Sequence, residues 1–489
     1  MALNLRTLLG PGIDIGEDAA ALAVSGLTAD SRMAKPGDVF FALPGGRADG
    51  ASFITDAVAR GAVAVVAEPK VTRSTVTVPL VHHANPRQRL ALAAARFHGL
   101  QPDICVAVTG TNGKTSVAAF VRQIWASMGF RAASLGTVGV VGPDGNRVLS
   151  HTTPDPVALH AILSELKSGD HVTHLALEAS SHGLVQHRLD GVQLAAGAFT
   201  NVTRDHLDYH TSFAEYFDAK MRLFRDLLPA GSAAVINADS DQAADVVAVA
   251  RSHGLAVFTV GVKGDNLRLV GQAREGFGQQ LRIEGHSVCH AVYLPLAGDF
   301  QASNALVAAG LVIATGGQES LVMHALESLK GAVGRLDLVA TTPAGAPVFV
   351  DYAHTPDALR TVLTTLRPYA RDRLAVVFGC GGDRDRGKRP QMGAIANELS
   401  DLAYVTDDNP RSENPGSIRA EILLACPKGI EIGDRAEAIR TSVGDLRDGD
   451  VLVVAGKGHE TGQTIGGETR PFSDHDVIRE AIGKVRARG

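Results

Sequence analysis

The sequence predicts an α/β protein of three domains with largely parallel sheets. The chain has 489 residues, and because one domain usually contains roughly 100–200 residues, we expect about three. Short apolar stretches typical of buried strands alternate with longer helical stretches, and this order favours parallel sheets. Hydrophobic residues make up 45% of the chain and charged residues 20%, which is typical of a globular protein with sizeable cores.

The first domain is expected at residues 1–102. It has the pattern of a small α/β unit, with an apolar strand at 62–67 and a helix at 86–97. Between Asp30 and Asp38 the chain is rich in residues that form turns and accept hydrogen bonds. Pro102, followed by Asp103, marks a plausible end of this domain.

The second domain is expected at residues 103–333 and opens with a strand, a glycine-rich turn and a helix. The strand covers 104–108 and the helix 114–128. Further strands are expected at 175–179, 196–201, 233–237 and 256–260, shorter alternating strands within 265–296, and helices at 302–314 and 319–330. Residues 331–334 have the composition of a linker.

The third domain, residues 334–489, has the pattern of a doubly wound sheet. Strands expected at 348–350, 374–378, 402–405 and 451–454 alternate with helices. An unusual polar cluster follows each strand, at 351–354, 381–384, 407–411 and 456–460. Open α/β sheets bind ligands beside the carboxyl ends of their strands, so we expect the four clusters to converge.

Charge, cysteine content and the absence of long apolar runs limit the possible partners and cellular compartments of the protein. Lysine and arginine total 47 against 52 acidic residues, a net charge of −5 without a long basic stretch, so we expect no nucleic-acid partner. The four cysteines are far apart, which predicts neither disulfides nor a zinc site and fits a reducing compartment. The first residues lack a cleavage pattern, and no apolar run reaches about 18 residues, so we expect a cytoplasmic protein without a membrane span.

A glycine-rich loop between the expected strand 104–108 and the helix after it is a candidate phosphate site. Its residues are Gly110, Thr111, Asn112, Gly113, Lys114, Thr115 and Ser116. Backbone N–H groups and the helix dipole favour phosphate oxygens there, Lys114 adds a cation, and the hydroxyl of Thr115 suits Mg²⁺. The loop departs from GxxxxGK[ST], because Val108 stands at the first glycine position. The alternative is an ordinary turn between a strand and a helix.

Two residues near this loop suit a metal ion. Glu178 ends an apolar strand, and a buried carboxylate is costly unless a cation accompanies it. His206 lies in a polar segment, where a histidine bonded to the backbone is the simpler interpretation.

Spacing alone assigns no chemistry to two other segments. Lys220 lies on an amphipathic helix near three phenylalanines, where a surface lysine beside core aromatics is the simpler interpretation. Thr152 and Thr153 precede Pro154, Asp155 and Pro156, a segment that suits either ligand hydroxyls or a helix N-cap.

Taken together, these motifs resemble the Mur ligase family over nearly the whole chain. The matching segments are 30–38, 109–116, 151–156, 178–188, 201–210, 216–224, 351–357, 379–389, 408–411 and 456–460. The resemblance implies an N-terminal domain that holds a uridine nucleotide, a central P-loop ATPase-type parallel sheet and a C-terminal Rossmann-like domain that brings an amino acid. It also implies ATP as co-substrate, Mg²⁺ as cofactor and a monomer.

The resemblance assigns site residues position by position. Lys114, Glu178, His206 and Lys220 match the catalytic centre, and the metal ligands are Thr115, Glu178, His206 and Lys220, the last as a carbamate (N6-carboxylysine). The loop residues 110–116 with Asn304, Arg335 and Asp351 match ATP contacts. Ser31, Thr152, Thr153, Ser180, Gln186 and Arg188 match contacts to UDP-N-acetylmuramoyl-L-alanyl-D-glutamate. One departure is Gln301, where the family usually has asparagine.

Specificity for the amino acid is expected from the segment 408–411. Asp408, Asn409, Pro410 and Arg411 resemble the signature for meso-2,6-diaminopimelate, and Arg384, Gly456 and Glu460 match the family's other contacts. This amino acid differs from lysine by a distal carboxylate, which an arginine fork binds bidentately. The implied reaction phosphorylates the D-glutamyl γ-carboxylate and then joins it to the amino acid, a step of peptidoglycan precursor synthesis.

Other functions stay open at this stage. A lysine-adding ligase is disfavoured by Arg411, and a folylpolyglutamate synthase by residues 25–50. A regulatory module that binds ATP without turnover is disfavoured by the presence of Glu178, His206 and Lys220 together. A GTPase or a kinase would need a guanine-reading element or a hydroxyl acceptor, which the sequence does not suggest.

Overall fold

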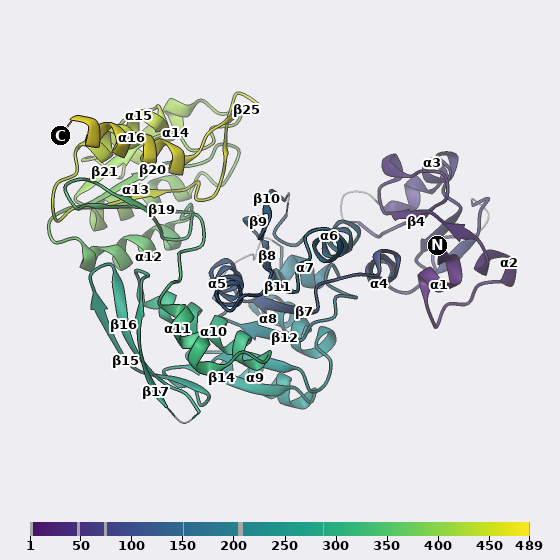
Figure 1. Ribbon diagram of the computed structural model, residues 1–489. Coiled ribbons are helices and arrows are strands. Elements are labelled where there is room, and N and C mark those ends of the chain that lie inside the picture. Colours follow the sequence, from purple (N-terminus) through teal and green to yellow (C-terminus); the bar gives the residue numbers. More distant parts are fainter. Residues whose placement is uncertain are drawn as a thin grey trace. The chain divides into compact units, whose positions relative to one another are not determined.

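The structure is a computed structural model that describes residues 3–45, 49–72, 76–149, 151–203, 209–286 and 288–488 (Figure 1). The chain forms two compact units. The first comprises Met1–Leu269, Glu284–Ser287 and Leu306–Ala325, and the second comprises Val270–Ile283, Val288–Ala305 and Leu326–Gly489. The chain therefore passes between the units more than once. The domain bounds 102/103 and 333/334 stay predictions.

The N-terminal part of the first unit is a small parallel sheet with helices. Its strand order is β3-β4-β5-β6, and all neighbours are parallel. The strands are β3 (Gly26–Thr28), β4 (Asp38–Phe41), β5 (Ala64–Ala67) and β6 (Leu80–His82), and the helices are α1 (Leu5–Leu9), α2 (Glu17–Ala20), α3 (Ile54–Ala59) and α4 (Pro86–His98). A two-stranded sheet of β1 (Leu3–Asn4) and β2 (Ala23–Val24) joins them. The expected strand and the helix at 86–97 are thus confirmed within two residues.

The central part of the first unit is built on a sheet ordered β10-β9-β8-β11-β7-β12-β13-β14. The strands are β7 (Ile104–Thr109), β8 (Ala132–Gly136), β9 (Gly139–Gly142), β10 (Gly145–Arg147), β11 (His174–Glu178), β12 (Ala196–Phe199), β13 (Ala233–Asn237) and β14 (Ala256–Gly261). From β8 to β14 the neighbours are parallel, and β9 and β10 pair antiparallel at one edge. The predicted parallel sheet is confirmed.

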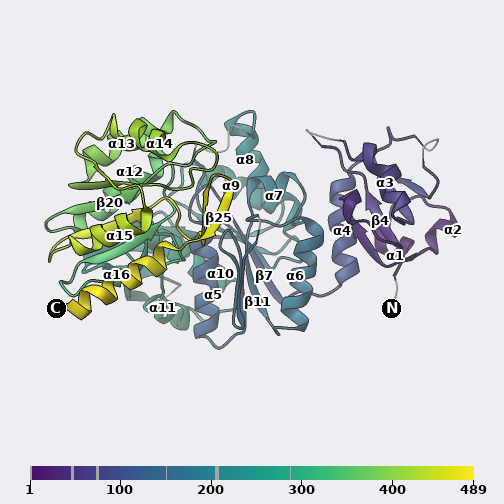
Figure 2. The same ribbon diagram turned by 90° about the horizontal axis from the view of Figure 1, so that it is seen from above.

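Helices cover this sheet. They are α5 (Lys114–Ser127), α6 (Pro156–Ser168), α7 (Ser181–Val185), α8 (Phe213–Arg222) and α9 (Ala243–Ser252). Figure 2 shows α5 on one side of strands β7 and β11 and α6 on the other. The strands at the centre of this sheet, β7, β8, β11, β12 and β13, are almost wholly buried, which explains why their sequences are largely apolar.

A segment of three strands and two helices contains the points at which the chain passes from one unit to the other. With 9 and 7 residues, the first two strands are longer than the short strands expected for 265–296. The strands β15 (Leu267–Glu275), β16 (Gly278–Glu284) and β17 (Cys289–Leu294) are neighbours in that order. Buried and exposed residues alternate along them, as the sequence predicts for 265–296. Helices α10 (Asp299–Ala314) and α11 (Glu319–Leu326) follow, and α11 ends before the predicted residue 330.

The second unit contains a six-stranded sheet ordered β18-β19-β23-β20-β21-β22. The strands are β18 (Asp337–Thr341), β19 (Pro347–Asp351), β20 (Leu374–Phe378), β21 (Leu402–Val405), β22 (Ile430–Glu431) and β23 (Val451–Ala455). All neighbours are parallel except β18 and β19. A small hairpin of β24 (Gly462–Ile465) and β25 (Glu468–Pro471) follows β23.

Alternate residues of these strands face two separate cores. Phe349 of β19 packs in one core, and its neighbours Val348 and Val350 pack in the other. Helices α12 (Pro356–Leu366), α13 (Lys388–Leu399) and α14 (Pro415–Leu423) line the first core, and α15 (Arg435–Gly444) and α16 (Asp474–Arg488) line the second. Helices therefore cover both faces, which confirms the doubly wound pattern.

Candidate active site

The glycine-rich loop between β7 and α5 is fixed in place by a close approach at Gly110 and by hydrogen bonds to Asn201. A Cβ on Gly110 would lie 1.9 Å from Oγ1 of Thr200, so only glycine fits there. The loop is tied to the end of β12, because Asn112 N donates to Oδ1 of Asn201 (3.0 Å) and Thr111 N donates to Asn201 O (2.8 Å). Gly113 has a φ of 87° at the N-cap of α5. The N–H groups at a helix start suit an anion.

Two lysines converge on one carbonyl of this loop. Nζ of Lys114 donates to the oxygens of Gly110 (2.9 Å) and Thr111 (2.8 Å), and Nζ of Lys220 also donates to Gly110 O (2.9 Å). Lys220 is 1% exposed and lies over the ring of Tyr216. The interpretation of Lys220 as a surface lysine is therefore wrong, because α8 turns it toward the loop.

Glu178 is a buried carboxylate directly beside the loop. It is 2% exposed, and its Oε2 accepts hydrogen bonds from the hydroxyls of Thr115 (3.1 Å) and Thr137 (3.1 Å), while Oε1 accepts from Thr137 N (2.7 Å). A carboxylate and a hydroxyl at a helix start are oxygen ligands of the kind that Mg²⁺ prefers. Thr115 and Glu178 therefore fit a magnesium site.

Two further metal ligands were predicted. His206 lies outside the described residues. Lys220 is an amine here and would need its carbamate to bind a cation. Within the described part of the chain, no cluster of three histidine, cysteine or acidic side chains has the geometry of a metal site.

The residues predicted to contact the muramoyl-peptide form one hydrogen-bonded cluster around Thr153. Its hydroxyl donates to Glu178 O (2.9 Å) and lies 3.1 Å from Oγ of Ser180. Arg188 donates to Thr153 O and to Oε1 of Gln186 (2.8 Å). The hydroxyl of Thr152 lies 3.1 Å from that of Thr137. The cluster thus adjoins the Glu178 carboxylate.

Local structure explains how this cluster is presented. Ser180 caps α7 by accepting from Gly183 N (3.1 Å), and Asp155 caps α6. The N-cap interpretation of 151–156 and the ligand interpretation are therefore compatible. Burial lowers the pKa of the Arg188 guanidinium. Ser31 lies apart from the cluster in sequence, in a 3-10 helix of the N-terminal part, where its hydroxyl donates to the Asp56 carboxylate.

The predicted ATP contacts Asn304, Arg335 and Asp351 belong to the second unit. The Arg335 guanidinium lies 4.7 Å from the ring centre of Tyr352. Asp351 accepts from the backbone N–H groups of Leu336 (2.7 Å) and Ala353 (2.8 Å). Burial raises the pKa of Asp351, and the charge of Arg335 opposes this shift. Arg335 and Asp351 are thus electrostatically coupled.

Asn304 differs from those two residues in its contacts. It lies on α10, and its Nδ2 donates to Oε1 of Gln301 (3.1 Å). Gln301 is one residue at which the sequence departs from the pattern that the resemblance predicts, and it accepts a hydrogen bond from the Asn304 amide. The departure therefore leaves Asn304 a polar partner.

The polar clusters after β21 and β23 meet, as predicted. Nδ2 of Asn409 donates to Oε2 of Glu460 (2.9 Å), and Nζ of Lys457 donates to Oδ1 of Asn409 (3.0 Å) and to Oε2 of Glu460 (2.8 Å). Burial would raise the pKa of Glu460, but the bond and charge of Lys457 hold it below its usual value. Burial also raises the pKa of Asp408, against the charges of Arg435 and Lys457. The carboxyl edge of this sheet is therefore a dense, buried ionic site.

Arg411 joins this site to the loop after β20. Its Nη1 donates to Gly382 O (2.8 Å), and its backbone φ is 53°, in the left-handed region. A Cβ on Gly382 would lie 1.9 Å from Pro410 O, and one on Gly456 would lie 2.9 Å from Oδ2 of Asp408. These glycines let the loops cross at van der Waals distance. Arg384 is exposed on the same loop as Gly382.

Two residues of the site were not assigned from the sequence. Thr137 holds the Glu178 carboxylate through its N–H and its hydroxyl. It follows β8, a neighbour of β11 that was not predicted, so no signal in the sequence pointed to it. Lys457 is fully buried, and its signal is a lysine between glycines directly after the apolar strand β23. Burial of a lysine is rare unless it is paired.

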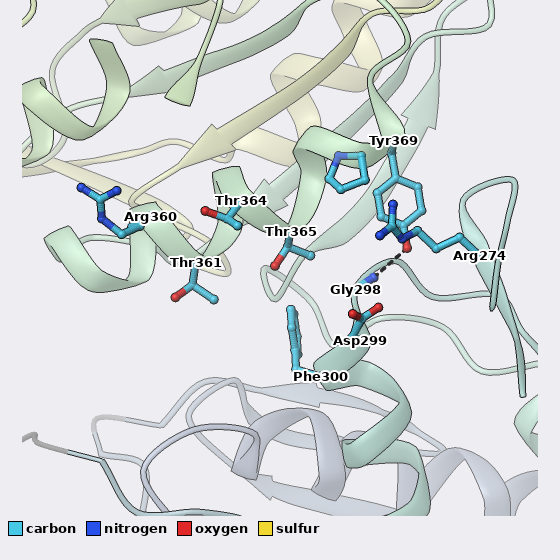
Figure 3. Close-up of a pocket in the computed structure, with 10 residues that line it drawn as sticks. Arg274, Gly298, Asp299, Phe300, Arg360, Thr361, Thr364, Thr365 and Tyr369 are labelled. Carbon is cyan, nitrogen blue, oxygen red and sulfur yellow. Dashed lines mark hydrogen bonds between the residues drawn. The ribbon is translucent and has the colours of Figure 1, made fainter. Parts of the chain in front are cut away.

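The second unit also has a pocket of about 500 Å³, formed by side chains from α12, the start of α10, β15 and the turn after α12 (Figure 3). Its lining residues are Arg274, Gly298, Asp299, Phe300, Arg360, Thr361, Thr364, Thr365, Pro368 and Tyr369. None of the residues predicted to contact ATP, the muramoyl-peptide or the amino acid is among them.

Comparisons with known proteins agree with this geometry. Residues 23–98 match the family described as "Mur ligase family, catalytic domain", residues 108–312 the "Mur ligase middle domain", and residues 334–458 the "Mur ligase, glutamate ligase domain". A protein of Mesorhizobium japonicum named UDP-N-acetylmuramoyl-L-alanyl-D-glutamate--2,6-diaminopimelate ligase is 57% identical over 98% of this chain and 99% of its own.

Solved structures share the fold. A structure of a UDP-N-acetylmuramoyl-L-alanyl-D-glutamate--2,6-diaminopimelate ligase superposes with a TM-score of 0.74 at 32% identity, over 99% of this chain and all of its own. A MurF ligase of Thermotoga maritima, solved with ADP, has a TM-score of 0.60 at 19% identity, over 95% of this chain and 99% of its own. The three-domain α/β fold class predicted from the sequence is confirmed, and the chain belongs to the Mur ligase family.

Proposed function

We propose that this chain is an ATP-dependent ligase that joins meso-2,6-diaminopimelate to UDP-N-acetylmuramoyl-L-alanyl-D-glutamate, a step of peptidoglycan precursor synthesis. The observation that carries the proposal is the buried site at the carboxyl edge of the second unit's sheet, where Arg411, Asn409 and Glu460 adjoin. An arginine and an acidic group there suit the distal carboxylate and the ammonium of this amino acid. The names of the relatives support the same acceptor.

In the first half-reaction, an oxygen of the D-glutamyl γ-carboxylate attacks the γ-phosphorus of ATP. ADP leaves and an acyl phosphate forms. The loop 110–116 cradles the phosphates with its N–H groups, and Lys114 neutralises developing charge. The muramoyl-peptide is held by the hydrogen-bonded cluster next to Glu178, which consists of Thr152, Thr153, Ser180, Gln186 and Arg188. Ser31 contacts the nucleotide part of that substrate.

In the second half-reaction, the amine of the incoming amino acid attacks the acyl carbon and phosphate leaves. This amino acid is oriented by residues of the second unit, namely Arg384, Asp408, Asn409, Pro410, Arg411, Gly456 and Glu460. ATP, the co-substrate of the first half-reaction, is also contacted by three other residues of this unit, Asn304, Arg335 and Asp351. Because two anionic reactants have to meet, their positioning supplies much of the acceleration.

Thr115 and Glu178 would hold Mg²⁺, together with His206 and the carbamate that Lys220 would form with CO₂. A bound Mg²⁺ neutralises charge on the phosphate oxygens. The buried amine of Lys220, next to Gly110 O, supports carbamate formation, because a carbamate would replace a buried cation by an anionic metal ligand.

The setting of the enzyme is proposed as a cytoplasmic monomer with domains at 1–102, 103–333 and 334–489. In the described residues, no helix combines the length and apolarity needed to cross a bilayer. The four cysteines are unpaired thiols, which is consistent with a reducing compartment.

The test is release of phosphate by the purified protein with ATP, Mg²⁺ and UDP-N-acetylmuramoyl-L-alanyl-D-glutamate, with meso-diaminopimelate, with L-lysine and without amino acid. We expect phosphate and a product of tripeptide mass only with meso-diaminopimelate. A preference for lysine would contradict the assigned specificity and keep the ligase. No stimulation by either amino acid would contradict the proposed reaction.

A further inference from the structure

His187 stands between Gln186 and Arg188, two residues proposed to contact the muramoyl-peptide, and has a role of its own. Its φ is 56°, a left-handed conformation that a residue other than glycine adopts only where the surroundings hold it. Both ring nitrogens are engaged. Nδ1 lies 3.0 Å from Oδ1 of Asp190, and Nε2 lies 2.8 Å from Nδ2 of Asn85.

The direction of the Asn85 contact follows from its second role. Oδ1 of Asn85 accepts from Gln88 N (3.1 Å) and so caps the start of α4. The amide N of Asn85 therefore faces His187 as a donor, and Nε2 of His187 has to accept. The proton of the neutral ring then lies on Nδ1 and is donated to Asp190. The contact admits one tautomer of a neutral histidine.

Asp190 anchors the other side of the ring. It is 3% exposed and accepts further hydrogen bonds from Nε2 of Gln88 (3.0 Å) and from Nη2 of Arg222 (3.3 Å). Arg222 also donates to Leu184 O. Gln88 belongs to α4 and Arg222 to α8, so Asp190 joins the N-terminal part of the first unit to its central part at the loop of His187.

The groups that face His187 have mixed charge. Asp190 is anionic, since the bond from His187 and the charge of Arg222 keep its pKa below the usual value although burial opposes this. On the α4 side, Asn85 N donates to Nδ1 of His83 (3.0 Å), whose other ring nitrogen lies 3.1 Å from Nη2 of Arg89. Next to His187 in the chain lies Arg188. Among the described contacts, Nε2 of His187 faces no carboxylate that could accept a hydrogen bond from it if the ring were protonated.

We infer that His187 is a positioning residue for the muramoyl-peptide: in its neutral form it couples the Gln186–Arg188 loop to the N-terminal part through Asn85. This inference rests on the proposed function, because it assigns the loop to that substrate. Protonation of His187 would set Nε2–H against the Asn85 amide. Either this bond breaks or Asn85 turns over and uncaps α4.

The test inverts the polarity of the contact with Asn85→Asp. Aspartate caps a helix as well as asparagine does, but its carboxylate accepts from a protonated Nε2 and cannot donate to a neutral one. The affinity for UDP-N-acetylmuramoyl-L-alanyl-D-glutamate is measured by calorimetry without ATP at pH 8 and at pH 6. The matched control is Asn4→Asp, which changes another asparagine cap, that of α1, where Thr7 N is the partner (2.8 Å).

For the wild type and Asn4→Asp we expect weaker binding at pH 6 by about two- to tenfold, the value of one ordinary hydrogen bond. For Asn85→Asp we expect the reverse, with tighter binding at pH 6 than at pH 8. His187→Gln should raise the KM for this substrate by a similar factor at pH 8, bring it close to that of the wild type at pH 6, and leave the KM for ATP unchanged. Melting curves at each pH check that every variant is folded.

The inference is overturned if Asn85→Asp keeps the pH dependence of the wild type, or if His187→Gln raises the KM for ATP as much as that for the muramoyl-peptide. If the wild type binds and converts the substrate, and Asn85→Asp and His187→Gln bind it with the same pH dependence, only the role of His187 is overturned. A wild type that neither binds nor converts the substrate overturns the proposed function, and the inference with it.

Discussion

The hydroxyl of Thr115 donates a hydrogen bond of 3.1 Å to Oε2 of Glu178, which joins the first turn of α5 to the carboxyl end of β11. This contact places a hydroxyl and a carboxylate side by side at the phosphate loop. If they hold Mg²⁺, Glu178→Gln should lower kcat by about 100-fold or more, because a bound metal contributes several kcal/mol to stabilising the transition state. Phosphate release measured over a range of Mg²⁺ concentrations checks this.

The glutamine is close to isosteric, so its oxygen can still accept from Thr137 and the fold should persist. Thr115→Ser keeps the hydroxyl and serves as the matched control, with activity within a few fold of the wild type. Full activity of Glu178→Gln at saturating Mg²⁺ would contradict the metal assignment.

Arg411 should determine the preference for the amino acid. Arg411→Ala removes the guanidinium proposed to bind the distal carboxylate, and we expect the KM for meso-diaminopimelate to rise by about 10- to 100-fold, as for loss of charge-assisted hydrogen bonds. The KM for the muramoyl-peptide should not change. Steady-state rates with each substrate varied in turn check this. An equal rise in both KM values would mean that Arg411 acts on the fold instead of on specificity.

Lys457 should stabilise the second unit because it is the buried cation between Asn409 and Glu460. Lys457→Met leaves the Glu460 carboxylate with the Asn409 amide but without its cation, and we expect a loss of about 3–5 kcal/mol in the free energy of unfolding. Urea denaturation measures it, with the exposed Lys263→Met as control. Adding Glu460→Gln to Lys457→Met should recover part of the loss; additive losses would contradict the pairing.

His160 should make the protein less stable in acid. Burial lowers the pKa of His160 to about 4, whereas an exposed histidine titrates near 6.5. The unfolded chain therefore binds a proton between these values that the folded chain does not, so stability falls as the pH drops through this window. Between pH 7 and pH 4.5 we expect His160 to account for a loss of about 2 kcal/mol.

Urea denaturation at both pH values, for the wild type and for His160→Gln, measures this contribution. The variant should lose less stability on acidification than the wild type does. His253→Gln, at an exposed histidine, should behave as the wild type. A pH dependence of His160→Gln equal to that of the wild type would contradict the assignment.

The strands of the parallel sheets could be predicted from the sequence because they are buried on both faces. β13, β20 and β21 have the predicted bounds; β20 and β21 are continuous apolar runs, and β13 is apolar up to its last residue, Asn237. The apolar spacing likewise predicted the start of α4 at residue 86, and the structure shows that Asn85 caps this helix by accepting from Gln88 N. The end of α11 was predicted too late, because Glu327 to Lys330 continue a helical pattern while the chain has already left the helix.

Side-chain roles could be predicted only where a strand fixed the position. Glu178 ends β11, and its burial beside the loop was foreseen. Lys220 was not, because helical spacing does not tell whether a lysine on the border of an apolar face lies outside or bends inward over Tyr216. Thr137 and His187 depend on contacts between segments far apart in the chain, and a single sequence carries no signal for such contacts.

The glycine at position 382 constrains the backbone of the segment 408–411, which is proposed to bind the amino acid. Because a Cβ there would meet Pro410 O at 1.9 Å, the backbone of the segment 408–411 is fixed from outside by its neighbour. The side chains of Asn409 and Arg411 also tie this segment to Glu460 and to Gly382 O. A substitution of either residue would change local contacts of the segment, whereas a substitution of Gly382 would displace its backbone. We therefore expect relatives with another amino-acid preference to keep a glycine at this position.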